Sequence, residues 1–469
     1  MDYIYRPGQE KKAKFILFSL LGIFLFLIPL PTGDGGFNIV LGHVIDWLAG
    51  VMDFMSLGTY APDATAGEFG LAYLLALIFL TVSFLGAIFV LIAKPRVIME
   101  TPMLKSAFVC SPVYLVSRGI GFALIWMLFL GIGPDLVINN WTGDTMLELT
   151  AGLVVLFIVL GPTLPILTDF GLMEFAGVFM RKVVRKLFTV PGRASIDFIA
   201  SWFGSSNASV LITRDQLEKG QYTVREAAVI TVNFSFVSLP FTFYIANYLN
   251  LSGSFLAFYG VISIVIFILA LVTPRIWPLS SMDDEYLDDV GDLLHEDVPP
   301  GLTPLQYAVE SGSRRANTAS LKDVAKAGAD AYLGIFLDLM PVILAWGTIA
   351  LVISETTPVF EWLSFPFRFV LEWFQMEPEY APAIITGFVD MFIPAIKVAE
   401  APVRTAFIIG ALSIVQLVYL SETGVMIMKS KMQLNIGKLA IIFMIRTLIG
   451  LPLIVGITAL FSMLGWTPW

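Results

Sequence analysis

The residues best suited to chemistry form a polar cluster, Gly204-Ser205-Ser206-Asn207-Ala208-Ser209, inside the apolar segment 195–212. Glycine and serine allow a helix to unwind at membrane depth, and the backbone groups freed in this way can face a ligand. Asn207 adds two donors and an acceptor, which suit a nucleobase edge, a ribose hydroxyl or an amide. The alternative is that these small residues only allow two helices to pack closely.

A second short apolar segment, 382–396, contains Asp390. A carboxylate in an apolar stretch is costly and usually functional. Asp390 could bind Na⁺ together with backbone carbonyls, or carry a coupling proton. It could instead form a structural ion pair with Lys397 or Arg404. The candidates for ion coupling are Asp390, Lys397 and Glu400.

Other polar side chains lie in the apolar segments that follow. They could line a cavity or form hydrogen bonds between helices. Together with the cluster at 204–209, the candidates for substrate binding are Gly204, Ser205, Ser206, Asn207, Ser209, Asn233, Ser235, Thr386, Asp390, Ser413 and Gln416.

Four further charged residues are of interest. Asp169 and Glu174 are either surface carboxylates or a gate pair. Arg118 is expected to reach the cytoplasmic interface along its stem, and Asp338 could pair with it or line a path.

The composition is that of a membrane protein. Of 469 residues, 57% are hydrophobic and 14% are charged, whereas a soluble protein would carry about a quarter charged residues. A net charge of −9 argues against a nucleic-acid surface. One cysteine and two histidines give no metal site. No nucleophile–histidine pair and no phosphate-binding loop occurs, so the sequence indicates no enzyme and no cofactor apart from Na⁺ as a coupling ion.

Membrane spans can be predicted from apolar stretches of about 20 residues. An all-α polytopic protein with about nine transmembrane helices results. The predicted spans are 15–31, 71–93, 108–131, 150–168, 227–248, 255–273, 331–353, 403–420 and 437–461. The segments 195–212 and 382–396 are too short or too interrupted to cross, and are predicted to be re-entrant.

Lys and Arg in the loops set the orientation. The basic residues before 15 place the N-terminus on the cytoplasmic side of the membrane. The loop 32–70, which lacks Lys and Arg, and the acidic stretch 355–380 are expected on the outside.

The spans are arranged as an inverted-topology repeat, because each half has a span, a re-entrant segment and two more spans, from opposite sides. Residues 1–145 form a scaffold with three spans, 150–275 the first repeat, and 331–465 the second. Residues 276–330 are expected to be a cytoplasmic linker, either merely solvated or with a regulatory or partner-docking role.

The stretch Phe203-Gly204-Ser205-Ser206-Asn207-Ala208-Ser209-Val210-Leu211-Ile212-Thr213-Arg214 resembles the first re-entrant hairpin of concentrative nucleoside transporters. The following Thr223-Val224-Arg225-Glu226-Ala227 resembles the start of their next helix. The chain as a whole is similar to bacterial inner-membrane proteins of the YjiH-like type with a "nucleoside recognition" or Gate domain, and a second Gate unit is expected in 331–465. The resemblance implies that Ser205, Ser206 and Asn207 occupy the positions of base and ribose contacts, with Asn207 where those carriers have an acidic residue.

These observations lead to an expected function. The chain is expected to be a secondary active transporter of a small polar metabolite, with a nucleoside as one candidate, coupled to Na⁺ or H⁺. An amino-acid or small-peptide carrier is an alternative, and a non-transporting membrane sensor or subunit is another. The expected partners are the small-molecule substrate, the lipid bilayer and, by analogy, further copies of the chain.

Overall fold

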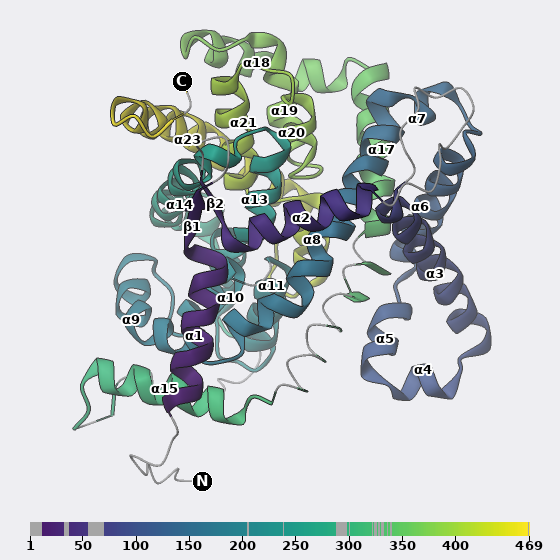
Figure 1. Ribbon diagram of the computed structural model, residues 1–469. Helices are drawn as coiled ribbons and strands as arrows, with labels where there is room; N and C mark the ends of the chain where they lie inside the picture. Colours follow the sequence, from purple (N-terminus) through teal and green to yellow (C-terminus); the bar gives the residue numbers. More distant parts are fainter. Residues whose placement is uncertain are drawn as a thin grey trace.

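The protein is almost entirely helical (Figure 1). The computed structural model describes residues 12–31, 37–54, 70–203, 206–237, 239–287, 298–299, 301–320, 340–467 and 469, with a few isolated positions between 322 and 337. Within these ranges one small departure from the all-α prediction occurs. Strands β1 (Pro29–Pro31) and β2 (Phe37–Ile39) pair antiparallel, with Leu30 opposite Asn38.

The N-terminal region agrees with the predicted spans only in part. Helix α3 (Leu71–Ala93) has the predicted bounds. Helix α1 (Lys12–Leu27) ends earlier than expected, where Pro29 and Pro31 cannot continue a helix. Helix α6 (Pro112–Leu130) begins at Pro112 and not at 108, after the short helices α4 (Arg96–Glu100) and α5 (Pro102–Phe108).

The prediction that 32–70 is only a loop is wrong. It contains helix α2 (Val40–Phe54), which runs across the molecule from the end of α1 (Figure 1). Its 15 residues are fewer than a perpendicular span needs, so a search for long apolar stretches does not find it.

Helix α8 (Thr145–Thr168) follows a short α7 (Asp135–Ile138) and a wide helical turn, η1 (Asn140–Asp144). Helix α9 (Leu172–Leu187) was not predicted, because its Arg and Lys residues break the apolar run. Next come α10 (Ala194–Phe203) and α11 (Ser206–Glu218), which are separate helices, as expected of an interrupted segment at 195–212.

Two predicted spans are wrong as continuous helices. Span 227–248 is divided into α12 (Val224–Phe234) and α13 (Leu239–Tyr248). Span 403–420 is α21 (Val403–Val415), which ends before Gln416 and is followed by η7 (Leu420–Gly424) and α22 (Val425–Lys429). An average over an apolar window conceals such breaks, since most residues around each break are apolar and buried.

The remaining helices complete the two halves. They are α14 (Phe255–Val272), α15 (Pro304–Thr318), α17 (Met340–Thr356), α18 (Val359–Trp373), α19 (Ala381–Thr386), α20 (Ile393–Lys397) and α23 (Ile436–Met463). No helix was predicted in the acidic stretch 355–380, which contains α18. The side chains of Trp362 and Trp373 on α18 are 71% and 82% exposed, which is typical of a helix at a membrane–water interface.

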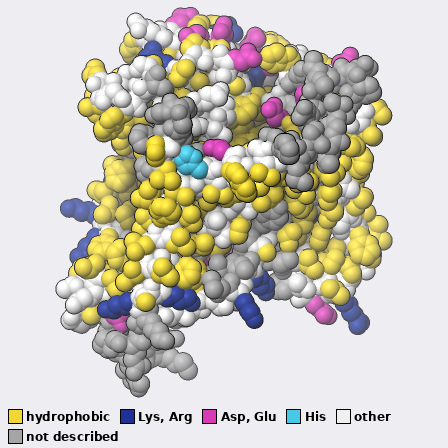
Figure 2. Space-filling view, viewed as in Figure 1, with side chains coloured by type: hydrophobic (Ala, Val, Ile, Leu, Met, Phe, Trp, Pro, Cys, Tyr) yellow, Lys and Arg dark blue, Asp and Glu magenta, His cyan; other side chains and the backbone are white. Residues whose placement is uncertain are grey.

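The protein is a multi-pass membrane protein. Among the described residues four helices are long and apolar enough to cross a membrane, or five if α17 and α18, bent by 76°, are one broken span. Shorter apolar helices, including 114–130 and 403–415, accompany them. Figure 2 shows apolar side chains over the middle of the molecule, with most of the visible Lys and Arg toward the end that holds α15. Most of the visible Asp and Glu lie toward the α18 end. The positive-inside rule places the end rich in Lys and Arg on the cytoplasmic side.

Part of the segment 276–330 packs on the helices before it. Helix α15 packs against α1 and α9. Arg315 of α15 binds Asp169 at 2.8 Å and Glu174 at 3.7 Å, which gives these two carboxylates a structural partner. Earlier in the linker, Asp284 accepts a hydrogen bond from Thr223 at 2.5 Å, at the start of α12.

Candidate substrate site

The first hairpin consists of α10 and α11, which pack against each other. Thr213 of α11 donates a hydrogen bond to Asp197 of α10 at 3.0 Å, so the two helices run antiparallel on either side of the break after Phe203. Tyr222 donates to the other oxygen of Asp197 at 2.6 Å. These buried contacts fasten the base of the hairpin. The sequence analysis missed Asp197, which lies within the segment 195–212 but seven residues before the polar cluster at 204–209.

Part of the predicted cluster at 204–209 belongs to the first turn of α11. Gly204 and Ser205 are outside the described residues, as are the side chains of Ser206 and Asn207, whose backbones begin α11. Ser209 is fully buried. The hairpin therefore presents the start of α11 at the position where the sequence predicts a ligand.

The break between α12 and α13 faces this hairpin. Ser201 of α10 donates a hydrogen bond to the carbonyl of Phe236, inside the break, at 2.7 Å. Trp202 stacks on the ring of Phe236, with centroids 5.2 Å apart and planes at 6°. The end of α10 thus covers the first interrupted helix.

The second hairpin is shorter. Helices α19 and α20 are joined by residues 387–392, which include Asp390. One oxygen of this buried carboxylate accepts from the backbone N–H of Phe392 at 2.8 Å, and the other from the hydroxyl of Ser421 at 2.6 Å. Ser421 was not among the sequence candidates, and it belongs to η7, directly after the second break.

Backbone pairing also joins this hairpin to the second break. The N–H groups of Leu420 and Ser421 donate to the carbonyls of Phe388 and Val389, at 2.9 and 3.0 Å. Gln416, at the end of α21, donates to the carbonyl of Ile384 and to the hydroxyl of Thr447, both at 3.0 Å. The hairpin and the interrupted helix therefore form one hydrogen-bonded unit.

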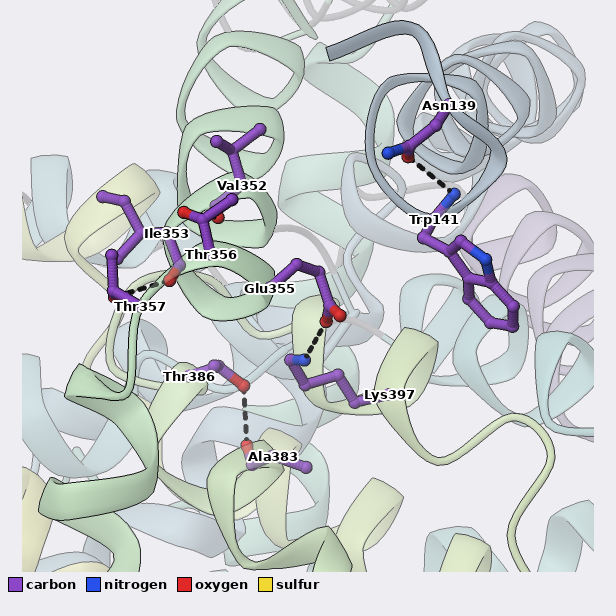
Figure 3. A network of polar contacts seen from close by, with 10 residues as sticks. All are labelled: Asn139, Trp141, Val352, Ile353, Glu355, Thr356, Thr357, Ala383, Thr386 and Lys397. Carbon is purple, nitrogen blue, oxygen red and sulfur yellow. Dashed lines mark hydrogen bonds and ion pairs between the residues drawn. The ribbon is translucent and has the colours of Figure 1, made fainter. Parts of the chain in front are cut away.

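Neither of the two ion pairs considered for Asp390, with Lys397 or with Arg404, is present. Lys397 binds Glu355 at 3.0 Å (Figure 3), and Arg404 donates to the carbonyls of Phe374 and Gln375. Glu400 is exposed. The structure therefore does not bring the three ion-coupling candidates together.

Three of the predicted substrate residues use their polar groups within the protein. Asn233 accepts hydrogen bonds from Thr273 at 2.5 Å and from Arg446 at 2.8 Å, which is the interhelical role and not the lining of a cavity. Ser413 and Thr386 donate to carbonyls of their own helices at 2.9 and 2.8 Å, the latter shown in Figure 3.

Three other predicted residues have free bonding capacity. Ser209 Oγ, Ser235 Oγ and Gln416 Oε1 are buried and have no hydrogen-bond partner in the part of the chain that the structure describes. An unpaired buried polar group costs about 1–3 kcal/mol. Such atoms at a hairpin and at both breaks are suited to a polar ligand or to water.

Two cavities adjoin the contact between Asp390 and Ser421. One, of about 370 Å³, lies between α6, α17 and the η7–α22 segment, and its lining is apolar except for residues such as Ser421 and Ser117. The other, of about 10 Å³, borders Asp390 and has room for about one water molecule. The hydrogen bond thus stands between a large and a small cavity.

Among the described residues, Arg118 and Arg446 are arginines with no exposed surface. Arg118 is fully buried and donates to the carbonyl of Ala107 at 2.9 Å, so the expectation that it reaches the interface is wrong. Asp338, its expected partner, lies outside the described residues. Arg446, also fully buried, donates to backbone carbonyls at both breaks. It was missed, although a charge in the middle of the predicted span 437–461 is a signal for function.

Comparison with known proteins agrees with the Gate resemblance. A family model described as "Gate: nucleoside recognition" matches residues 149–255, from α8 to the start of α14. An uncharacterized protein of Alkalihalophilus pseudofirmus is 40% identical over 450 residues, which cover 95% of this chain and 93% of the relative. The chain belongs to the same family as this relative, and its residues 149–255 form a Gate domain.

Two solved structures are similar along most of the chain. A structure of CNTnw in an outward-facing state has 14% sequence identity and a TM-score of 0.34, and the match covers 95% of this chain and 98% of the other. The YdaH transporter of Alcanivorax borkumensis has 11% identity and a TM-score of 0.21, and the match covers 97% and 98%.

Proposed function

We propose that this protein is a secondary active transporter of a small polar metabolite, and that a nucleoside is the first substrate to test. The observation that carries the proposal is the set of unpaired buried polar atoms on Ser209, Ser235 and Gln416. They belong to the first hairpin and to the two interrupted helices. In membrane carriers, interrupted helices in inverted repeats form the substrate site near the bilayer midplane.

The proposed site contains donors and acceptors of the kind that a nucleoside requires. Serine hydroxyls can donate and accept, and the free amide oxygen of Gln416 accepts. The family's description as nucleoside recognition supports the same substrate class. A zwitterionic amino acid is a weaker candidate, because Lys397 is engaged with Glu355 and is not available to bind a carboxylate beside Asp390.

Release of substrate would require the second hairpin to separate from η7. Three hydrogen bonds join them, from the N–H groups of Leu420 and Ser421 and from the hydroxyl of Ser421. Breaking a small set of aligned bonds is a discrete step, as alternating access requires. In this proposal the repeats 150–275 and 331–465 provide the moving elements and residues 1–145 the scaffold.

Counterflow into proteoliposomes tests the function. Vesicles loaded with unlabelled uridine or adenosine should accumulate the labelled nucleoside, and vesicles loaded with amino acids should not accumulate labelled amino acids. Vesicles without protein provide the background. If no solute accumulates and another membrane protein co-purifies with the chain, the protein is a non-transporting subunit and the proposal fails.

A further inference from the structure

A single side chain binds the carbonyl ends of both interrupted helices. Arg446, in α23, has none of its surface exposed. Its Nε and Nη2 atoms donate to the carbonyl oxygen of Val415, the last residue of α21, at 3.0 and 2.9 Å. Its Nη1 donates to the carbonyl of Val232 at 3.2 Å and to the side chain of Asn233 at 2.8 Å, both in the last turn of α12.

The charges at this point balance without a carboxylate. The unpaired carbonyls at the C-terminus of a helix are equivalent to about half of a negative elementary charge. Two such ends meet Arg446, so together they match one guanidinium. A buried cation normally requires a paired anion. The oxygens that accept from Arg446 in the described part of the chain are carbonyl and amide oxygens, and this explains how the charge is tolerated.

The same position suits a soluble cation. In carriers with interrupted helices, the C-terminal ends and unwound carbonyls coordinate Na⁺. Resting on the function proposed above, we propose that Arg446 is a built-in cation that takes the place of a coupling Na⁺ where α12 and α21 end. Binding of substrate to the protein should then not depend on Na⁺.

The oxygens that Na⁺ would need are already in use. Asn233 Oδ1 accepts from Thr273 as well as from Arg446. The carbonyl of Val415 accepts two N–H groups from the one guanidinium. A second cation here would also repel Arg446 strongly, because charges are poorly screened in a buried site.

The first test measures the thermal unfolding of the purified full-length chain in NaCl and in choline chloride of equal ionic strength. The unfolding temperature should be the same in both salts. A saturable rise with Na⁺ would show a Na⁺ site and overturn the proposal. This measurement needs no variant and no knowledge of the substrate.

The second test removes the guanidinium. The Arg446→Ala variant should unfold at a temperature lower by several degrees, and millimolar guanidinium chloride should restore part of the loss. Arg118→Ala is the matched control. Arg118 is equally buried, but it binds the carbonyl of Ala107 in α5 and not the end of an interrupted helix. If guanidinium raises the unfolding temperatures of both variants equally, or raises neither, the proposal is wrong.

A third comparison covers the case in which Arg446→Ala does not fold. Arg446→Lys keeps the charge, whereas Arg446→Gln keeps some hydrogen bonds and loses the charge. The Lys variant should unfold at the higher temperature. If the Gln variant matches or exceeds it, charge is not what the two helix ends require.

Counterflow of labelled uridine then separates the two proposals. Uptake by the unchanged protein should be equal in Na⁺ and in choline, and uptake that requires Na⁺ would overturn the role of Arg446. If no solute crosses at all, the transport function fails, while the unfolding measurements still decide whether Arg446 is the resident cation.

Discussion

The hydroxyl of Ser421 lies 2.6 Å from Oδ2 of Asp390, and this hydrogen bond fastens the second hairpin to the helix that is interrupted before residue 420. The carboxylate is buried, and its other oxygen is bound by a single backbone N–H. The hydrogen bond therefore stabilises a buried carboxylate at the contact between the second hairpin and η7. This contact must open if the protein transports.

Replacing Ser421 tests this junction. Ser421→Ala removes one of the two hydrogen bonds of a buried carboxylate and should reduce the free energy of unfolding by about 1–3 kcal/mol. Ser413→Ala is the control, because the hydroxyl of Ser413 bonds only within its own helix, to Gly410. Thermal unfolding in detergent should show a clearly larger loss for Ser421→Ala, and equal losses would contradict the role given to the Asp390 contact.

Ser235 should behave in the opposite way. Its hydroxyl has no partner in the described chain, so Ser235→Ala should leave the stability unchanged or raise it slightly. Nucleoside binding should weaken by about fivefold if this hydroxyl bonds the substrate, since one hydrogen bond contributes about 1 kcal/mol. Isothermal titration calorimetry measures the affinity for the nucleoside in the unchanged protein and in the Ser235→Ala variant. Ser201→Ala, which breaks a bond to Phe236, should instead lower the stability.

The contact between α6 and α17 depends on a glycine. A Cβ atom on Gly121 would lie 2.6 Å from the carbonyl oxygen of Pro341, so the helix backbones meet here directly. Gly121→Ala should reduce the stability by about 1–3 kcal/mol. Gly456→Ala, in α23, meets no atom within 4 Å and should be neutral or stabilising. Equal unfolding temperatures for the two variants would mean that α6 and α17 can move apart at Gly121 with little loss of stability.

The docking of the linker should depend on pH through Glu174, on α9, which lies outside the predicted spans. Burial raises the pKa of Glu174, and a backbone hydrogen bond and Arg315 oppose this effect. The native state therefore favours the protonated form. The stabilisation is fully present below the unfolded pKa, near 4.5, and is lost as the pH rises through the higher folded pKa.

Unfolding temperatures measured from acid to neutral pH should reveal this loss. Glu174→Gln should flatten the decline, because the amide does not ionise. Arg315→Gln should extend the decline to higher pH, because the cation that lowers the pKa is gone. A decline that is identical in all three proteins would assign the pH dependence to other groups.

Much of the fold could be predicted from apolar runs and turn residues. The bounds of α3 and the break within 195–212 followed from composition alone. The breaks after Phe234 and Val415 could not be predicted, since a polar residue in an apolar window does not reveal whether the helix ends there. Helices α2 and α18 were missed because they are too short or too charged for a span.

The candidate site was predicted in part. Ser209, Ser235 and Gln416 were chosen for polarity in apolar segments, and all three have unpaired buried atoms. Sequence could not distinguish them from Asn233 or Ser413, whose partners lie on other helices or in their own turn. Arg446 shows the same difficulty, because its importance comes from carbonyls that are distant in the chain.

The distance along the chain between Arg446 and its partners has a consequence for biosynthesis. Val232 precedes Arg446 by 214 residues, so the first interrupted helix leaves the ribosome long before the side chain that completes it. Until the last long helix enters the bilayer, that helix end must rely on water, lipid headgroups or a membrane chaperone. Truncation before residue 436 should therefore leave an immature protein that quality-control proteases degrade, even though the matched Gate region at 149–255 is complete.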